Sequence, residues 1–395
     1  MNWLSQTIAV TGVTLRSLGQ RLGSATVAVI GIAGVVIVFT AVLSIAEGFR
    51  AAMVGAGDPL RVIILRAGSD TEMTSGLSGD DANLIRDAPG VERSGDGPNA
   101  SPELFVIVGH PLKRTGTDAN VPLRGLTAAA IRVRPEVRIV EGRMLAFGTN
   151  EIVVGRAASR QYTGLEVGSS VRWGEGEWRV VGVFEAGGSV AESEIWSDAR
   201  VLQPAYRRGN SYQSVLVRLA SPGSFQTLKD ALTADQRLNV TALREQEYYA
   251  EQSRVLQSII RTIGFGIAGL MGLGAIFGAV NTMYSAVASR TREIATLRAL
   301  GFGRTPVVIS VMVEAVILSL IGGVIGGGLA WLVFDGYQTA TMNWQSFSQV
   351  AFAFAVTPAL LARGLFYAVI MGMLGGLLPA LRAARLPIVT ALRQL

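Results

Sequence analysis

The sequence SRTREIATLRALGFGR, from Ser289 to Arg304, decides how the rest of the chain is interpreted. It lies between two runs that contain no Asp, Glu, Lys or Arg, Thr262–Ser289 and Ala315–Phe334. A helical residue rises about 1.5 Å, so about 20 apolar residues cross the hydrocarbon core of a bilayer. Both runs are long enough, and the basic segment between them is therefore expected to be a short loop between two membrane-spanning helices.

This loop carries four arginines against a single acid, and short arginine-rich loops stay on the cytoplasmic side of a membrane. The range Arg290–Leu300 is expected to be helical, because Ile294, Leu297 and Leu300 recur at three-residue spacing. Gly301 then provides a favourable C-terminal stop. Two interpretations of the short helix stay open: a docking element for a cytoplasmic partner, or an ordinary positive loop at the lipid surface.

The composition is that of a membrane protein. Half of the residues are hydrophobic and 16% are charged, against about 25% in soluble domains. A basic surplus can indicate nucleic-acid binding, but most of these charges are arginines beside apolar runs, which favours a membrane and argues against a nucleic-acid partner. The chain has no cysteine, so disulfides are excluded, and its single histidine, His110, cannot assemble a zinc site.

The first 21 residues are mildly amphipathic and are expected to form a cytoplasmic or interfacial helix. An uncharged run then extends from Leu22 to Ala46. It exceeds the 7–15 apolar residues of a signal peptide, so a retained span is favoured over a cleaved leader. Arg16 and Arg21 precede the run and place the N-terminus inside.

Residues 48–256 have the composition of a soluble α+β domain that is large enough for its own core. Alternating apolar and polar residues predict strands at Val62–Leu65, Glu151–Val154, Ser170–Trp173, Trp178–Phe184, Glu194–Trp196 and Ser214–Leu219. Helices are expected at Asp80–Asp87, Ala157–Tyr162 and Ser224–Ala234. Residues 69–120 are rich in turn-forming residues and are expected to contain mobile loops. Glu192 and Glu194 are interpreted as solvated acids or strand ends, and nothing here indicates catalysis.

A polar helical stretch from about residue 243 is expected to continue into the second span as a rigid stalk. The letters Gly264–Gly269 match the dinucleotide-binding pattern G-x-G-x-x-G, but they lie inside an apolar run with no strand before them, so that interpretation is rejected. Small residues at helical spacing predict close helix packing in lipid instead. The residues assigned to such packing are Gly274, Gly278, Gly322 and Gly326.

The third span contains one acid, Glu314, about one or two turns from its cytoplasmic start. A charge at mid-membrane costs about 2.5–3.5 kcal/mol, so this carboxylate needs a partner or water. A snorkelling or arginine-paired structural acid is favoured over a role in coupling. Thr357-Pro358 is a helix start for the fourth span, and arginines after that span place the C-terminus inside.

The expected topology has four spans with both termini in the cytoplasm. The segments are an N-terminal helix (1–21), a first span (22–47), an external domain (48–256, with its stalk from about 243), a second span (257–288), the basic loop (289–304), a third span (305–334), an external connection (335–356), a fourth span (357–381) and a cytoplasmic tail (382–395).

Several stretches of the chain carry a resemblance to a known family. They are SRTREIATLRALGFGRTPVVISVMVEAVILSLIGGVIGGGLAW (289–331), GLLPALRAARLPIVTALR (376–393) and, in the external domain, EIVVGR (151–156), VGSSVRW, WRVVGVF and SEIW. These stretches, in this order and topology, resemble the MacB/FtsX-type permeases of ABC transporters, which include the LolC/LolE lipoprotein-release subunits. Residues 69–120 are not matched.

The resemblance implies a permease of the bacterial inner membrane with a large periplasmic domain. It implies a dimer, with a second copy or a paralogue, that binds two cytoplasmic ATPase subunits, and in some members a periplasmic adaptor. The loop helix would be the coupling helix that docks on the ATPase. The implied docking residues are Arg290, Arg292, Glu293, Leu297, Arg298, Leu300 and Gly301, and Arg290 and Arg292 are also expected to touch lipid phosphates.

The chain itself is not expected to be an enzyme. A P-loop requires Gly-Lys-Ser/Thr, and neither Lys113 nor Lys229 follows a glycine. ATP and Mg²⁺ are therefore expected on a separate ATPase, with no cofactor in this chain. Two functions stay open: export or extraction of a substrate (lipoprotein, lipid, peptide or amphiphile), which is favoured, and FtsX-like signalling to a periplasmic partner such as a cell-wall hydrolase.

Overall fold

The structure is a computed structural model that describes residues 6–12, 22–55, 57–343 and 345–387. The chain divides into two compact units. A helical unit comprises residues 1–47, 259–337 and 354–395, and an α+β unit comprises residues 48–258 and 338–353. Residues 6–12 are helical; the rest of the expected N-terminal helix and the end of the C-terminal tail lie outside the described residues.

The α+β unit is built on a mixed sheet in which ten strands are described, in the order β14-β1-β13-β5-β6-β11-β8-β10-β7 with β9 also on β10. The strands are β1 Arg61–Arg66, β5 Ala100–Pro111, β6 Asp118–Leu126, β7 Arg138–Gly142, β8 Glu151–Gly155, β9 Ser170–Trp173, β10 Gly176–Glu185, β11 Ile195–Asp198, β13 Ser214–Arg218 and β14 Val240–Arg244. Short pieces flank them at β2 Leu77–Ser78, β3 Arg93–Ser94, β4 Gly97–Pro98 and β12 Ser211–Tyr212. Only the β6–β11 and β8–β10 pairs among these are parallel.

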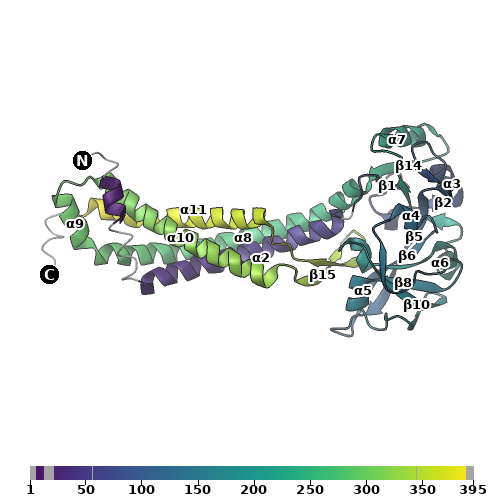
Figure 1. Ribbon diagram of the computed structural model, residues 1–395, viewed down its shortest axis with the longest axis horizontal. Helices are drawn as coiled ribbons and strands as arrows, with labels where there is room; N and C mark the ends of the chain where they lie inside the picture. The colour runs from purple at the N-terminus through teal and green to yellow at the C-terminus, as the bar shows by residue number, and fades with distance from the viewer. Residues whose placement is uncertain (1–5, 13–21, 56, 344, 388–395) are drawn as a thin grey trace. The chain divides into compact units, whose positions relative to one another are not determined.

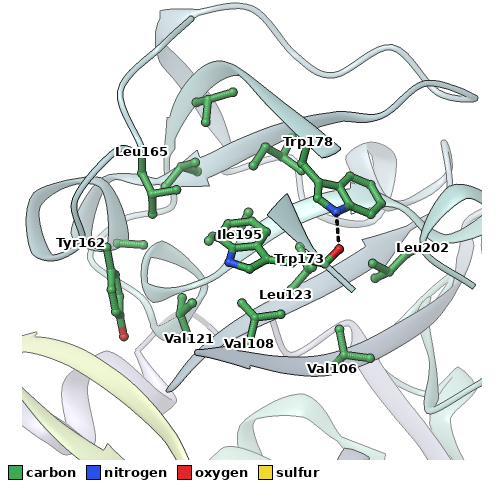
Figure 2. Packing of buried hydrophobic residues seen from close by; sticks show 14 of the residues in the cluster. Val106, Val108, Val121, Leu123, Tyr162, Leu165, Trp173, Trp178, Ile195 and Leu202 are labelled. Atoms are coloured by element: carbon green, nitrogen blue, oxygen red, sulfur yellow. Dashed lines mark hydrogen bonds between the residues drawn. The ribbon is translucent and has the colours of Figure 1, made fainter. Parts of the chain in front are cut away.

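The two largest apolar clusters among the described residues of this unit pack against the sheet. One packs β1 and β13 against α3 (Gly79–Arg86) and α7 (Ser224–Ala234), with Ile85, Leu228 and Val217 fully buried. The other gathers side chains of β5, β6, β8, β10 and β11 with those of α5 (Arg156–Gln161) and α6 (Ala199–Ala205). Figure 2 shows Trp178 in this second cluster, where its indole Nε1 donates to the carbonyl oxygen of Trp173 at 3.2 Å. The small helical pieces α4 (Ala130–Val133), η2 (Glu72–Thr74) and η3 (Val190–Ser193) complete the unit.

The strands and helices expected from the sequence in this unit are confirmed, with ends that differ by one or two residues. The expectation of loops is wrong for residues 100–111, which form β5 in the middle of the sheet. Its apolar run Leu104–Val108 is flanked by proline and glycine, which hid the strand signal.

The connection at 335–356 also has structure that the sequence did not indicate. β15 (Gln338–Asn343) and β16 (Ser348–Ala353) form a hairpin that belongs to the α+β unit. The backbone N–H of Ala351 donates to Ser193 Oγ at 2.9 Å, and Asn120 Nδ2 donates to the carbonyl oxygen of Phe347 at 2.8 Å. Phe352 packs edge-on against Phe49, with ring centroids 5.6 Å apart.

The helical unit contains four long helices that lie side by side, and each has a stretch long and apolar enough to cross a membrane (Figure 1). They are α2 (Leu22–Val54), α8 (Glu245–Ser289), α10 (Arg304–Phe334) and α11 (Pro358–Arg385), and a short helix, α9 (Thr291–Ala299), joins α8 to α10. The expected start of the fourth span is confirmed, since the Thr357 hydroxyl accepts from the N–H of Leu360 and Pro358 opens the helix. α8 is continuous over 45 residues, so the stalk sequence and the second span are one helix.

Glycines allow α2 and α10 to approach closely. A Cβ at Gly326 would lie 2.5 Å from the carbonyl oxygen of Ala33, and one at Gly322 would lie 2.9 Å from that of Val29. The expectation for the second span differs: Gly274 and Gly278 have no described atom within 4 Å of a built Cβ. Those two glycines lie on an open face of α8 and pack against no other helix in the described part of the chain.

We predict that Gly326→Ala destabilises the helical unit by about 1–3 kcal/mol, because the added methyl would overlap the Ala33 carbonyl. Gly328→Ala, on the same helix with open space around it, is the matched control and should be neutral or slightly stabilising, since alanine is the better helix former. Thermal unfolding of the detergent-solubilised protein measures both. Equal melting temperatures for the two variants would contradict the close approach.

Candidate functional site

The candidate site is α9, which lies at one end of the helical unit (Figure 1). α8 ends at Ser289, and Arg290 breaks the helix with φ −110° and ψ 11° before α9 begins. The expected stop at Gly301 is confirmed: its φ is +95°, its N–H donates to Arg298 O, and the N–H of Phe302 donates to Leu297 O. This pair of bonds is the Schellman motif, which favours glycine at that position.

α9 has a buried side and an exposed side. Ile294 and Ala295 are buried, and Leu297 is half-buried. The outer face of α9 is exposed and consists of Arg292, Glu293, Thr296, Ala299 and Leu300. Leu300, at the end of the helix, is 73% exposed.

Arg290 was expected to dock on a partner and touch lipid, but the structure places it inside. Its side chain is buried and its Nη1 and Nη2 donate to the two carboxylate oxygens of Glu314 on α10, at 3.1 and 3.3 Å. The expectation that Glu314 is an arginine-paired acid is confirmed. Removing one partner of a buried ion pair typically costs about 3–5 kcal/mol, so this pair holds the start of α9 against α10.

Arg298 also turns inward, at the other end of α9. Its Nη1 donates to the carbonyl oxygens of Ala384 and Leu386, both at 2.9 Å. These carbonyls lie at the C-terminal end of α11, where backbone acceptors lack helical partners and a positive charge is favoured. Of the expected docking set, Arg292, Glu293, Leu300 and Gly301 are exposed, Leu297 and Arg298 are partly buried, and Arg290 is buried.

A small cavity of about 30 Å³ lies beside the Arg290–Glu314 pair, lined by Ser310, Leu297 and neighbouring side chains. It is large enough for a water molecule and too small for an organic substrate. Within the described residues, no group of three or more His, Cys, Asp or Glu side chains is placed to hold a metal ion. His110 has a structural role, because its Nε2 lies 2.7 Å from the Thr163 carbonyl oxygen and its ring packs edge-on against Trp173.

The α+β unit contains a second cluster of charges, centred on Arg124 of β6. Its guanidinium donates to Glu194 at 2.8 Å, to Glu72 at 2.6 and 2.9 Å and to Glu103 at 3.0 Å. Arg134 donates to both oxygens of Glu103 at 2.6 and 2.8 Å. All five side chains are buried, so the cluster ties β5, β6, η2 and the start of β11 together in the interior.

Of the two alternatives for Glu194, a solvated acid is therefore wrong, whereas a strand end is confirmed, since Glu194 directly precedes β11. Glu194 is 4% exposed and also accepts from the indole N–H of Trp196 at 2.8 Å. Its cationic partner lies 70 residues away along the chain, and no local pattern connects the two. The sequence predicted a strand that begins at Glu194 and none at Arg124, so it did not indicate that the two residues meet.

The pKa of Glu103 reflects this setting. Burial disfavours the charged carboxylate, but the guanidinium groups of Arg134 and Arg124 outweigh burial and hold the pKa of Glu103 below its usual value. A lowered pKa in the folded state means that the unfolded state binds the proton more tightly. The stabilising contribution is therefore complete above the unfolded pKa of about 4.3 and is lost as the pH falls through the folded value.

Comparisons with known proteins match both units. Residues 25–235 match the MacB-like periplasmic core domain, which is more than half of the chain, and residues 265–388 match the FtsX-like permease C-terminal domain. The chain belongs to the MacB/FtsX-type family of ABC transporter permeases. The α+β unit is thus a periplasmic domain of the MacB kind, and α9 lies in the FtsX-like part.

Three relatives illustrate the similarity. The macrolide export ATP-binding/permease protein MacB of Nitrobacter winogradskyi is 27% identical, and the match covers 93% of this chain and 56% of that protein. The MacB protein of Nitrosomonas europaea is 25% identical, and the match covers 92% of this chain and 55% of that protein. The pyoverdine export ATP-binding/permease protein PvdT of Pseudomonas entomophila is 30% identical, and the match covers 64% of this chain and 40% of that protein. The chain spans about half the length of these curated relatives, or less.

Among solved structures, the periplasmic region of MacB from Actinobacillus actinomycetemcomitans aligns with 49% of this chain and 92% of its own, at 14% identity and a TM-score of 0.37. The extracellular domain of the ABC-type transporter YknZ from Gram-positive bacteria aligns with 46% of this chain and 99% of its own, at 16% identity and a TM-score of 0.35.

We predict that Glu103→Gln lowers the free energy of unfolding of the protein at about pH 7 by about 3–5 kcal/mol, because Arg134 then loses the carboxylate to which two of its nitrogens donate. The variant should lose less stability than the wild type on acidification below about pH 4. Denaturant titrations followed by tryptophan fluorescence measure both. Glu166→Gln, which breaks an exposed pair with Lys113, is the control and should change little. Equal effects of the two variants would contradict a stabilising role for the buried Glu103–Arg134 pair.

Proposed function

We propose that this chain is the permease component of a MacB-type ABC transporter, which passes ATP-driven motion from a cytoplasmic ATPase to the periplasmic domain for export or extraction of a substrate. The observation that carries this proposal is the outer face of α9, exposed in a chain whose C-terminal part matches FtsX-like permeases. Family membership supports the class of protein. The exposed face of α9 is where the motion of the ATPase would be transmitted to this chain.

The orientation of the chain follows from the charges near α9. Arg292, Arg304, Arg382 and Arg385 are all exposed, and Arg298 fixes α9 to the end of α11 that carries two of them. Arginines favour the cytoplasmic side of a bacterial inner membrane. We therefore infer that α9 and both termini are cytoplasmic and that the α+β unit is periplasmic.

ATP and Mg²⁺ would be bound by an ATPase that lies outside these 395 residues. Neither lysine of the chain follows a glycine, as a P-loop requires. The relatives with the widest coverage are named as combined ATP-binding and permease proteins, and the chain aligns with only 56% and 55% of their lengths. These facts support the proposal that ATP is bound outside these 395 residues.

A second permease chain is the other partner that the structure favours. In the most apolar part of α8, 22% of the residues are buried, against 44–50% in the other three helices. Leu270 and Phe277, two turns apart, are each 73% exposed, and Gly274 between them has open space around it. Small and large apolar residues on one helix face suit close packing of a second helix in lipid.

The substrate is proposed only as a class. The relatives are named for export of macrolides, pyoverdine and syringafactin, which favours export of an amphiphile or peptide over the extraction of lipoproteins or lipids. The match to FtsX-like permeases keeps signalling to a cell-wall hydrolase as the second candidate. Affinity purification from the native membrane separates the two, since a periplasmic adaptor should accompany an exporter and a hydrolase should accompany a signalling protein.

We predict that Glu293→Arg weakens binding of the ATPase at least about tenfold, or about 1.4 kcal/mol, because it reverses a charge on the outer face of α9. The measurement is co-purification and titration of the ATPase against the purified permease. Asp230→Arg, an equally large charge change on α7 of the periplasmic domain, is the control and should bind normally. Normal binding by Glu293→Arg would count against this face as the docking site.

We also predict that cysteine at Leu270 or Phe277 gives disulfide-linked dimers when the membranes are oxidised. The chain has no native cysteine, so any cross-link reports the new residue. Ala279→Cys is the control on the same helix: Ala279 is 7% exposed and lies against Gly375, so it should not cross-link. If neither test position cross-links, a second copy of this chain does not cover this face.

A further inference from the structure

The inner side of α9 carries two arginines that flank a buried isoleucine. Arg290, Ile294 and Arg298 follow one another at four-residue spacing, and residues at this spacing lie along one side of a helix. Ile294 is buried, and the two arginines bond to different helices. Basic residues of this loop would ordinarily be assigned to lipid phosphates or to the partner, but these two are already engaged inside the protein.

We propose that Arg290 and Arg298 are positioning residues, which hold α9 in a fixed orientation so that its outer face is presented to the partner. Arg290 fixes the start of α9 to α10 through Glu314, and Arg298 fixes its end to the terminal carbonyls of α11. The role of the outer face rests on the proposed function; the fixed orientation does not.

The Arg290 contact restrains direction as well as distance. Two nitrogens of one planar guanidinium donate to the two oxygens of one carboxylate, and such a bidentate pair sets the relative orientation of the two groups. Arg290 is also the residue at which the chain leaves α8, with φ −110°. The ion pair therefore acts at the bend itself, where a small rotation would swing the whole of α9.

The Arg298 contact restrains the opposite end. One nitrogen donates to the carbonyl oxygens of both Ala384 and Leu386, at the last turn of α11 and its C-cap. A load on Leu300, two residues further on, would then reach α11 through Arg298 and α10 through Arg290. The two spans that receive the load are the ones joined by the β15–β16 hairpin of the periplasmic domain.

The test uses a reporter on the outer face of α9. Leu300→Cys places the only cysteine of the chain at a site that is 73% exposed, where a nitroxide spin label reports the mobility of the helix. The full chain is reconstituted in lipid nanodiscs without any ATPase, and its electron paramagnetic resonance spectrum is recorded. Arg290→Ala, Glu314→Gln and Arg298→Ala are each expected to make the label markedly more mobile.

Two further variants separate positioning from general loss of structure. Combining Arg290→Ala with Glu314→Gln should mobilise the label no more than either change alone, because the two act on one contact. Exchanging the pair, Arg290→Glu with Glu314→Arg, should restore the rigid spectrum, and Arg290→Lys should give an intermediate one because it lacks the second bond. Arg292→Ala, on the outer face, is the matched control and should leave the spectrum unchanged.

An unchanged spectrum in both Arg290→Ala and Arg298→Ala would overturn the proposal, and so would an equal response in Arg292→Ala. If the exchanged pair does not fold, Arg290→Lys and Glu314→Gln still decide the matter. Titration with the ATPase is a separate measurement: if the wild type binds no ATPase, the proposed function fails while the spin-label result stands. If Glu293→Arg abolishes binding of the ATPase while the spin label at position 300 stays immobile, docking by the outer face and positioning by the two arginines are both supported as separate roles.

Discussion

An ionised side chain that leaves water needs an opposite charge at hydrogen-bond distance, and both units of this protein depend on that constraint. In the helical unit, Arg290 and Glu314 satisfy each other where α8 gives way to α9. In the periplasmic unit, the buried Arg124 pairs with three carboxylates from separate segments of the chain, Glu72, Glu103 and Glu194. A buried pair of this kind contributes modest net stability, but it tolerates few alternative arrangements, so it defines where its elements lie.

The arginines of the basic loop show why charge alone does not reveal function. Four arginines in a short loop between two spans satisfy the rule for cytoplasmic loops whichever way they point. In the structure they divide into an inner pair, Arg290 and Arg298, and an outer pair, Arg292 and Arg304. The inner pair attaches α9 to the neighbouring helices, whereas Arg292 on the outer face of α9 and Arg304 at the start of α10 stay exposed.

The sequence was sufficient for features that depend on neighbours along the chain. The uncharged runs predicted the long helices, alternation predicted six strands, and Gly301 marked the end of α9. Features that depend on distant partners were missed. β5 was hidden by its proline and glycine residues, Glu194 finds its arginine 70 residues away, and the inward turn of Arg290 required the position of Glu314 on another helix. Gly274 and Gly278 had the spacing of packing residues, but spacing does not specify which molecule they pack against.

The β15–β16 hairpin changes what counts as the periplasmic domain. Because residues 338–353 belong to the α+β unit, the chain enters or leaves that unit four times and not twice. A fragment that stops at Ser258 would omit two strands, leave the ring of Phe49 without Phe352, and remove the hydrogen-bond partners of Ser193 and Asn120 on the hairpin. The domain is therefore discontinuous in sequence, and a faithful soluble version would have to splice the hairpin back to the rest of the fold.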